Sequence, residues 1–246
     1  MSHNKFKGYC LTCPVRNKSI FSDIPESSLD KTIKDFHTAV VSYDVGETIF
    51  YQHDDSSKSA YTLRKGLIKI TKGLPDGRVQ IVRILMAGEL FGFDGFANES
   101  YNHSAIALTK VEVCRLPLKD LSKLRQSYKE IDASIMARFI KNLRQSEDMM
   151  LELGAKKASE RLASFILNLT QADIRQGVNH FEDAQWLDLP LSRSDIGALL
   201  GLTIETVSRF FSDWKRKGYI KESKGTLKLI DPKGLKAAAC SGGSCE

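Results

Sequence analysis

The chain has 246 residues, of which 42% are hydrophobic and 27% charged, and its formal net charge is +6. This composition argues against a disordered chain, and no run approaches the roughly 20 consecutive apolar residues that a membrane span requires. The polar residues 1–8 lack the apolar core of a signal peptide, so we expect a cytoplasmic protein with no membrane partner. The basic balance suits a nucleic-acid partner, because Lys and Arg neutralise phosphates.

The chain contains five cysteines: Cys10, Cys13, Cys114, Cys240 and Cys245. An odd number in a protein expected in a reducing compartment argues against a disulfide framework. The first two form a C-x-x-C motif within the N-terminal segment 1–22, and such a motif can bind a metal or act as a redox thiol pair. The last two lie in the small-residue tail 237–246, which we expect to be flexible.

Residues 23–122 are predicted to form a sensory β-barrel. Short runs rich in β-forming residues alternate there with turn residues; they span residues 48–51, 60–63, 66–71, 79–85, 103–108 and 111–116. Strands at this spacing are typical of a β-sandwich or barrel. Pro75, Asp76 and Gly77 predict a hairpin turn, because Pro presets φ and Gly accepts a positive φ.

Residues 123–154 are predicted to form one long helix that ends near Gly154. Apolar side chains recur along it at helical spacing; they are Ile131, Ile135, Phe139, Leu143, Met150 and Leu153. This face either packs on the barrel of its own chain or pairs with a second copy, and we favour the homodimer. The expected dimer interface contains Ile135, Phe139, Asn142, Leu143, Ser146 and Met150.

Residues 155–236 are predicted to form a DNA-binding domain that begins with a helix over 158–173. Two short helices around a tight turn follow, in which Ser192 or Ser194 caps the first helix and Gly201 permits the reversal. Thr203 caps the second helix, whose apolar face carries Val207, Phe210, Phe211 and Trp214. The pattern is that of a helix-turn-helix, whose second helix enters the major groove.

The opposite face of that second helix carries the candidate DNA-binding residues, which are Glu205, Ser208, Arg209, Lys215 and Arg216, together with the capping Thr203. Arg209 can donate two hydrogen bonds to guanine, Glu205 can accept one from cytosine, and Ser208 can contact a base or a phosphate. The alternative is that Glu205 and Arg209, four residues apart, form only a surface salt bridge. Residues 217–221 and 225–230 predict a wing whose lysines contact phosphates.

The order of barrel, long helix and winged helix-turn-helix, with the segments 87–94, 158–165 and 200–209, resembles the CRP/FNR family of bacterial transcription regulators, in particular its FNR branch. The resemblance implies an α+β fold: a cyclic-nucleotide-binding-type β-barrel (double-stranded β-helix), a dimerisation helix and a C-terminal winged helix-turn-helix. It implies a homodimer on palindromic DNA, with Glu205, Ser208 and Arg209 at the positions that read TTGAT half-sites. It also implies contact with RNA polymerase through barrel loops, for which Asp76, Gly77 and Arg78 are candidates.

The same resemblance suggests a sensor. FNR holds an oxygen-labile 4Fe–4S cluster through N-terminal cysteines spaced C-x2-C-x5-C and one distant barrel cysteine, and Cys10, Cys13 and Cys114 match three of these positions. Ser19 occupies the remaining N-terminal position, although thiolates are the usual ligands of such clusters. The fourth ligand stays open among Ser19, Asp23, Cys240 and Cys245. A lone buried Cys114 can instead be a small core residue.

Several residues bear on ligands other than an iron–sulfur cluster. The nucleotide-binding branch pairs a segment similar to residues 88–90 with an Arg-Ser pair that neutralises the cyclic phosphate; His103 and Ser104 stand here instead, which disfavours cyclic AMP. Haem is a further alternative, with His37, His53 or His103 as axial ligand, and so is a regulator that answers a small molecule or thiol oxidation. The sequence has no phosphate-cradling glycine loop, nucleophile elbow or His-rich metal triad, so we expect no enzyme.

Overall fold

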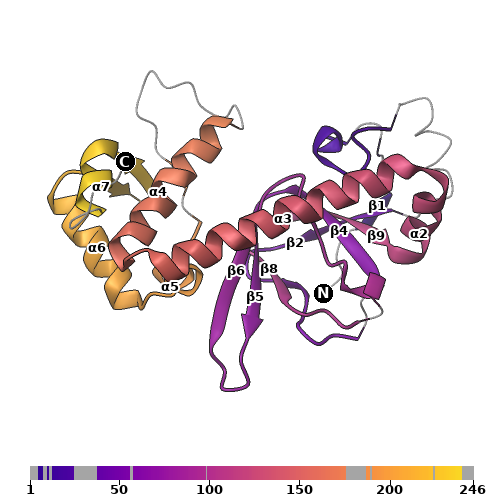
Figure 1. Ribbon diagram of the computed structural model, residues 1–246, viewed down its shortest axis with the longest axis horizontal. Helices are drawn as coiled ribbons and strands as arrows, with labels where there is room; N and C mark the ends of the chain where they lie inside the picture. Colours follow the sequence, from indigo (N-terminus) through magenta and orange to yellow (C-terminus); the bar gives the residue numbers. More distant parts are fainter. Residues whose placement is uncertain are drawn as a thin grey trace. The chain divides into compact units, whose positions relative to one another are not determined.

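The computed structural model describes residues 5–7, 10, 13–24, 38–55, 58–97, 99–175, 187–188, 190–223 and 225–239. The chain divides into two compact units, Met1–Gln145 and Ser146–Glu246 (Figure 1). None of the helices in these ranges is long and apolar enough to cross a membrane.

Unit 1 is built from two antiparallel sheets. The first has the order β1 (Lys5–Lys7), β2 (Ala39–Tyr43), β9 (Val111–Pro117), β4 (Ser59–Lys65) and β7 (Leu90–Phe91). The second has the order β3 (Thr48–Phe50), β8 (Ser104–Ala107), β5 (Ile68–Gly73) and β6 (Val79–Leu85). Figure 1 shows the β5–β6 hairpin extending beyond the other strands. The predicted antiparallel N-terminal β domain is confirmed.

Two hydrophobic cores follow from the alternation of side chains along the strands. One core draws on strands of both sheets and includes Leu63, Val113 and a stack of Phe50 on Tyr101, whose ring centroids lie 3.8 Å apart. The other uses the opposite face of the first sheet, where Cys114, the residue after Val113, packs with the N-terminal segment and with the helices that follow β9. The β9 strand therefore contributes to both cores.

The helical region of unit 1 differs from the single helix expected over residues 123–154. Helix α2 (Leu118–Ser127) ends at Tyr128, which is extended, and α3 spans Lys129–Ala155. Tyr128 packs against the second core, and this contact explains a break that has neither Pro nor Gly. Two short 3-10 helices, η1 (Arg16–Lys18) and η2 (Asp94–Ala97), complete the described elements of the unit.

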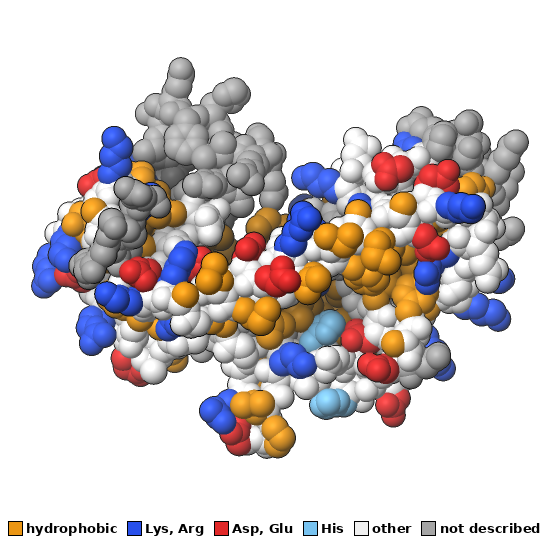
Figure 2. All heavy atoms as spheres, viewed as in Figure 1, with side chains coloured by type: hydrophobic (Ala, Val, Ile, Leu, Met, Phe, Trp, Pro, Cys, Tyr) orange, Lys and Arg blue, Asp and Glu red, His pale blue; other side chains and the backbone are white. Residues whose placement is uncertain are grey.

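The apolar residues of α3 fall into two groups. Ile135 was expected at the dimer interface, but it is only 5% exposed and lies with Ile131 in the second core of its own unit. Phe139, Leu143 and Met150 are 43%, 59% and 64% exposed. Figure 2 shows hydrophobic side chains gathered along this helix on the visible face. Of these predicted interface residues, Phe139, Leu143 and Met150 are exposed enough to contact a partner, whereas Ile135 is not.

Unit 2 contains the predicted winged helix-turn-helix, and its elements are α4 (Ala158–Arg175), β10 (Leu187–Asp188), α5 (Arg193–Leu200), α6 (Ile204–Arg216), β11 (Ile220–Ser223), β12 (Thr226–Leu229) and α7 (Pro232–Ala239). Its strands pair antiparallel in the order β10-β12-β11.

Helix α7 corrects the expectation of a flexible tail from residue 237, because the helix continues to Ala239. Proline suits a first helical position, and the Asp231 carboxylate accepts a hydrogen bond of 2.8 Å from the Gly234 amide. Cys240 and Cys245 lie outside the described residues.

Candidate nucleic-acid interface and cysteine site

The turn between α5 and α6 is fixed by local interactions. Ser192 and Asp195 form a reciprocal capping box at the start of α5, with hydrogen bonds of 3.0 and 3.1 Å. Gly201 ends the helix in the left-handed conformation, with φ of 63°. A side chain at Gly197 would lie 2.6 Å from the Leu202 carbonyl oxygen, so only glycine permits this close turn.

Helix α6 has one buried and one exposed face. Val207, Phe211 and Trp214 are buried in unit 2. Glu205 and Arg209 are exposed and Ser208 is half-buried, all on α6. The structure shows no ion pair between Glu205 and Arg209, so in the described part of the chain the alternative of a mere salt bridge finds no support. Hydrogen bonds from its own backbone amide and from Thr203 lower the pKa of Glu205, which keeps this carboxylate charged.

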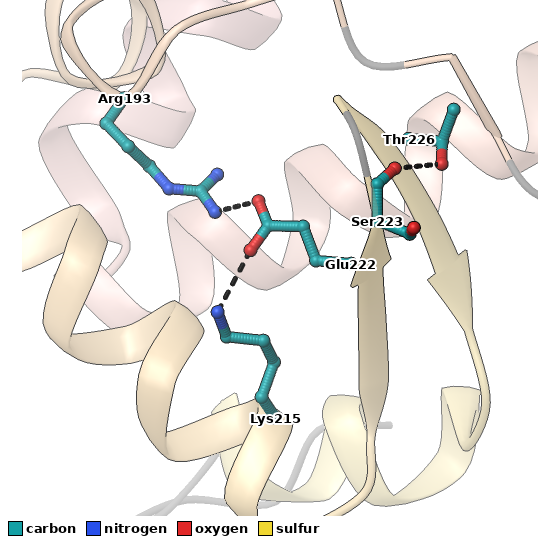
Figure 3. A network of polar contacts seen from close by, with 5 residues as sticks. All are labelled: Arg193, Lys215, Glu222, Ser223 and Thr226. Carbon is teal, nitrogen blue, oxygen red and sulfur yellow. Dashed lines mark hydrogen bonds and ion pairs between the residues drawn. The ribbon is translucent and has the colours of Figure 1, made fainter.

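The remaining predicted DNA-binding residues have roles within the protein. The Thr203 hydroxyl accepts a hydrogen bond of 3.2 Å from the Thr206 amide and caps α6. Lys215 pairs with Glu222 of the wing at 3.0 Å (Figure 3), and Arg216 pairs with Asp213 at 2.6 Å. Near the start of α6, Glu205 and Arg209 form no ion pair in the described part of the chain, whereas the cations near its end, Lys215 and Arg216, each pair with a carboxylate.

Ile204, the first residue of α6, was not among the predicted DNA-binding residues. Its side chain is 48% exposed beside Glu205. An exposed aliphatic side chain next to the predicted base-reading residues suits contact with a thymine methyl group. The signal in the sequence was an isoleucine directly after the helix cap, at a position that does not belong to the apolar face of the helix.

Three of the predicted metal ligands gather in one buried region of unit 1. Cys10 and Cys114 are buried, Cys13 is half-buried, and Cys114 lies on β9 beside Thr62 and Val40. Burial and then the neighbouring thiols raise the pKa of Cys10 to about 11 and that of Cys114 to about 12. Both thiols are therefore protonated at neutral pH unless a metal binds them.

Arg64 and Thr38 lie close to these thiols. The positive charge of Arg64 and a hydrogen bond with the Thr38 side chain each act against the rise in the pKa of Cys10 and Cys114. The Nε atom of Arg64 is buried without a hydrogen-bond partner in the structure. A half-buried arginine whose Nε atom has no hydrogen-bond partner, beside three thiols, fits an anionic metal–thiolate centre, because that centre would supply a negative charge and an acceptor.

The described residues do not complete the ligand set. They contain no group of three or more ligand side chains already arranged around one metal position. Ser19 is buried, and its hydroxyl donates to the Arg16 carbonyl at 2.8 Å and accepts from the Phe21 amide at 3.2 Å, so it already has structural partners. Asp23 is exposed. The fit thus extends to three thiols of a four-ligand site.

The histidines and Ser104 bear on the alternative ligands. His37 lies outside the described residues, and His53 contacts the Gln52 side chain at 3.2 Å. His103 packs edge-on against Phe50 at a centroid distance of 5.5 Å, and burial lowers its pKa. The Ser104 hydroxyl accepts a hydrogen bond of 2.8 Å from the Gln52 amide. Ser104, which stands at the serine position of the Arg-Ser pair of the nucleotide-binding branch, is thus already engaged in a contact within the protein.

The turn predicted for polymerase contact lies at the tip of the β5–β6 hairpin. Gly77 has φ of 86°, and Arg78 pairs with Asp76 at 2.8 Å. Leu74 and Val79, which flank the turn, are exposed. The tip thus presents charged and apolar side chains together.

Two family models match the chain. The model described as "Cyclic nucleotide-binding domain" matches residues 40–128, and that described as "Crp-like helix-turn-helix domain" matches residues 160–238. The nitrogen fixation regulation protein FixK of Bradyrhizobium diazoefficiens is 31% identical over 235 residues, which cover 95% of this chain and 94% of that protein. The transcriptional activator protein FnrA of Stutzerimonas stutzeri is 33% identical over 194 residues, covering 79% and 78%.

Solved structures give the same result. FixK2 from Bradyrhizobium japonicum superposes with a TM-score of 0.70 at 29% sequence identity, covering 84% of this chain and 99% of that one.

Proposed function

The chain belongs to the CRP/FNR family of transcription regulators, and on this premise we propose that two copies bind palindromic DNA through α6 and read TTGAT-type half-sites. The matching relatives are regulators, which confirms the prediction of a DNA-binding regulator rather than an enzyme. The observation that supports the finer proposal is the exposure of Glu205 and Arg209 on the face of α6 opposite its buried residues. These two side chains, with the half-buried Ser208, supply the hydrogen-bonding groups for G·C and neighbouring pairs.

The test compares Arg209→Ala with Arg216→Ala, which removes an equal charge from the end of the same helix. We expect Arg209→Ala to weaken binding to a TTGAT palindrome by about 30-fold or more, because a dimer loses two bidentate base contacts of about 1–3 kcal/mol each. Binding to a scrambled duplex should change little more than it does in Arg216→Ala, as measured by fluorescence anisotropy. An equal loss on both duplexes would show that Arg209 contacts only phosphate.

The dimer proposed here uses the exposed group on α3. Phe139 and Leu143 lie in unit 1, and Met150 lies on the part of α3 that belongs to unit 2. Residues seven apart, such as Leu143 and Met150, return to nearly the same helix face, so they form a stripe that suits a parallel pairing with a second copy. Asn142 and Ser146 lie on the same stretch, and Ile135 is left out because it is buried.

The sensor proposed here is the cysteine site. Cys10, Cys13 and Cys114 would hold a 4Fe–4S cluster, with a fourth ligand that the described residues do not supply. A bound cluster would supply oxygen-sensitive redox chemistry. This chain's residues would provide the thiolates, and the Arg64 cation would offset part of their charge. Because both buried thiols are protonated without metal, assembly would release protons and would weaken as the pH falls.

Iron and sulfide analysis of anaerobically purified protein tests the sensor. We expect stoichiometric iron and sulfide and a brown colour that bleaches in air. In Cys114→Ala the iron, the sulfide and the colour should all be lost. A colourless protein whose DNA binding still changes on oxidation, and loses that change in Cys114→Ala, would favour a thiol-redox regulator. A colourless protein unaffected by Cys114→Ala would refute a sensor at this site.

The β5–β6 tip is the proposed contact with RNA polymerase. Its support is the exposure of Leu74, Asp76, Arg78 and Val79 on a hairpin whose turn is held by the Asp76–Arg78 pair. We expect Asp76→Ala and Arg78→Ala to lower activated transcription in vitro without changing DNA affinity. Unchanged transcription from both variants would exclude this surface.

A further inference from the structure

The wing carries a carboxylate at an inward-facing position. Side chains alternate along β11, so that Ile220 and Glu222 face the helices while Lys221 faces outward. The pairing of β11 with β12 places Glu222 opposite Leu227, which is fully buried. Apolar residues are typical of such a position, so the charge at Glu222 needs partners.

Glu222 finds those partners on both helices of the helix-turn-helix (Figure 3). One carboxylate oxygen pairs with the Arg193 guanidinium at the start of α5, and the other pairs with Lys215 Nζ at 3.0 Å in the last turn of α6. The Glu222 and Arg193 side chains are only 26% and 24% exposed. This partial burial makes the network stronger than a solvent-exposed ion pair.

The Arg193 guanidinium also lies over the Phe211 ring, 3.4 Å from its centroid. Phe211 belongs to the buried face of α6. A planar guanidinium that stacks on a ring and pairs with a carboxylate is held in one orientation, which a lysine cannot reproduce. The network therefore joins α5, α6 and β11 through one side chain of the wing.

On the outer face of the same hairpin, Lys221 and Lys228 stand directly opposite each other. Like charges in this arrangement repel each other and destabilise the strand pair. In the part of the chain that the structure describes, no carboxylate forms an ion pair with either lysine. Phosphate groups of DNA would supply the missing negative charge.

We propose that Glu222 is a positioning residue for DNA binding, because its pairs with Arg193 and Lys215 hold the wing at the orientation in which Lys221 and Lys228 meet the phosphate backbone. This inference rests on the proposed function, since it requires DNA on the side of unit 2 that presents these lysines. Glu222 itself contacts no DNA.

The test measures DNA affinity of the full-length protein against KCl concentration, for a TTGAT palindrome and for a scrambled duplex. We expect Glu222→Gln to make the slope of log K against log salt shallower by up to about 3.6, since each phosphate contact contributes about 0.9 and a dimer presents two lysines on each of two wings. Asp213→Asn is the matched control, because it removes the same charge from a carboxylate that pairs with Arg216 and Lys217. Its slope should equal that of the unaltered protein or be steeper.

A second arm keeps the net charge constant. Arg193→Lys loses the two-pronged guanidinium and its stack on Phe211. It should make the slope shallower by itself, so the test does not depend on whether Glu222→Gln folds. In a Lys221→Ala/Lys228→Ala background, Glu222→Gln should cause no further reduction. A steeper or unchanged slope in both single variants, or a further reduction in the lysine-free background, would overturn the proposal. Equal affinity of the unaltered protein for both duplexes would instead refute the sequence-specific function.

Discussion

Lys215 and Arg216, near the end of α6, pair with carboxylates of the same unit, whereas Arg209, near its start, forms no ion pair in the described part of the chain. The residue types and helical spacing placed Glu205, Ser208 and Arg209 on one face of a helix, and that face is outward in the structure. The sequence did not show that Lys215 and Arg216 have carboxylate partners. Glu222 lies on a strand that reaches Lys215 only after folding, so no local pattern could reveal that pair.

Ile135 shows the same limit for apolar residues. Helical periodicity identified a face of α3 but could not distinguish the core of the same chain from a second copy. Ile135 is one turn from Phe139, yet it lies in the core while Phe139 is 43% exposed. Side chains from α2 and from the N-terminal segment surround Ile135 in this core, and those of the N-terminal segment are more than a hundred residues away in sequence.

His103 leads to a prediction about pH. Burial lowers its pKa, partly opposed by the charge of Asp94, and its Nε2 atom is buried without a hydrogen-bond partner in the structure. Above its ordinary pKa of about 6.5 the residue is neutral in both the folded and the unfolded chain. As the pH falls below that value the unfolded chain binds a proton first, so the stability of unit 1 should decrease.

Thermal unfolding at pH 7.5 and pH 5.5, chosen to lie about one unit either side of the ordinary histidine pKa, measures this effect. We expect His103→Gln to lose less stability on acidification than the unaltered protein, because it cannot bind the proton. An identical decrease in the two proteins would show that His103 does not contribute to the pH dependence.

At the level of elements, Arg138 joins α3 to the cysteine-bearing segment. Its guanidinium donates hydrogen bonds to the carbonyl oxygens of Lys18 and Ser19 at 2.8 and 2.5 Å, and to that of Ser134 at 2.9 Å. The residue lies between the buried and the exposed groups of α3. A movement of the segment that follows Cys13 would thus change the hydrogen bonds that this segment forms with the helix proposed for dimerisation.

We expect Arg138→Ala to lower the free energy of unfolding by about 1.5–3 kcal/mol, the range for hydrogen bonds that involve a charged group. Amide hydrogen exchange in residues 13–24 should accelerate, since their docking to α3 is lost. Arg144→Ala, an exposed arginine on the same helix, is the control and should change neither quantity. Unaltered exchange in Arg138→Ala would mean that the segment is held by its buried apolar residues alone.

Element boundaries were predictable where local chemistry sets them. Thr203 and the left-handed Gly201 were identified directly, and of the two serines that could cap α5, the structure shows that Ser192 does so. The break at Tyr128 has no such signal, because it follows from packing against the second core. Helix α7 did have a signal, the Asp231–Pro232 start, which the small residues after it obscured.

For the whole molecule, the order of β domain, helices and winged helix-turn-helix was predictable. After Pro117 the spacing of hydrophobic residues changes abruptly from that of short strands to that of helices. The sensor was predictable only in part. Cys10 and Cys114 are about a hundred residues apart, and only the resemblance to a family suggested that they meet. The pairing of β2 with β9 then brings the N-terminal segment to Cys114.

Dimerisation gives a prediction at this scale. Leu143→Glu should convert the protein to a monomer in sedimentation velocity, because a carboxylate would be buried in the apolar stripe. The control is Lys141→Glu, which places the same side chain about 200° around the helix. A dimer that persists in Leu143→Glu would place the interface elsewhere.

The most direct measurement compares the affinity of the anaerobically prepared protein for a TTGAT palindrome and for a scrambled duplex of the same composition, at one salt concentration. A regulator that reads bases through Glu205, Ser208 and Arg209 should bind the palindrome about a thousandfold or more tightly. A ratio near one would contradict sequence-specific reading by α6.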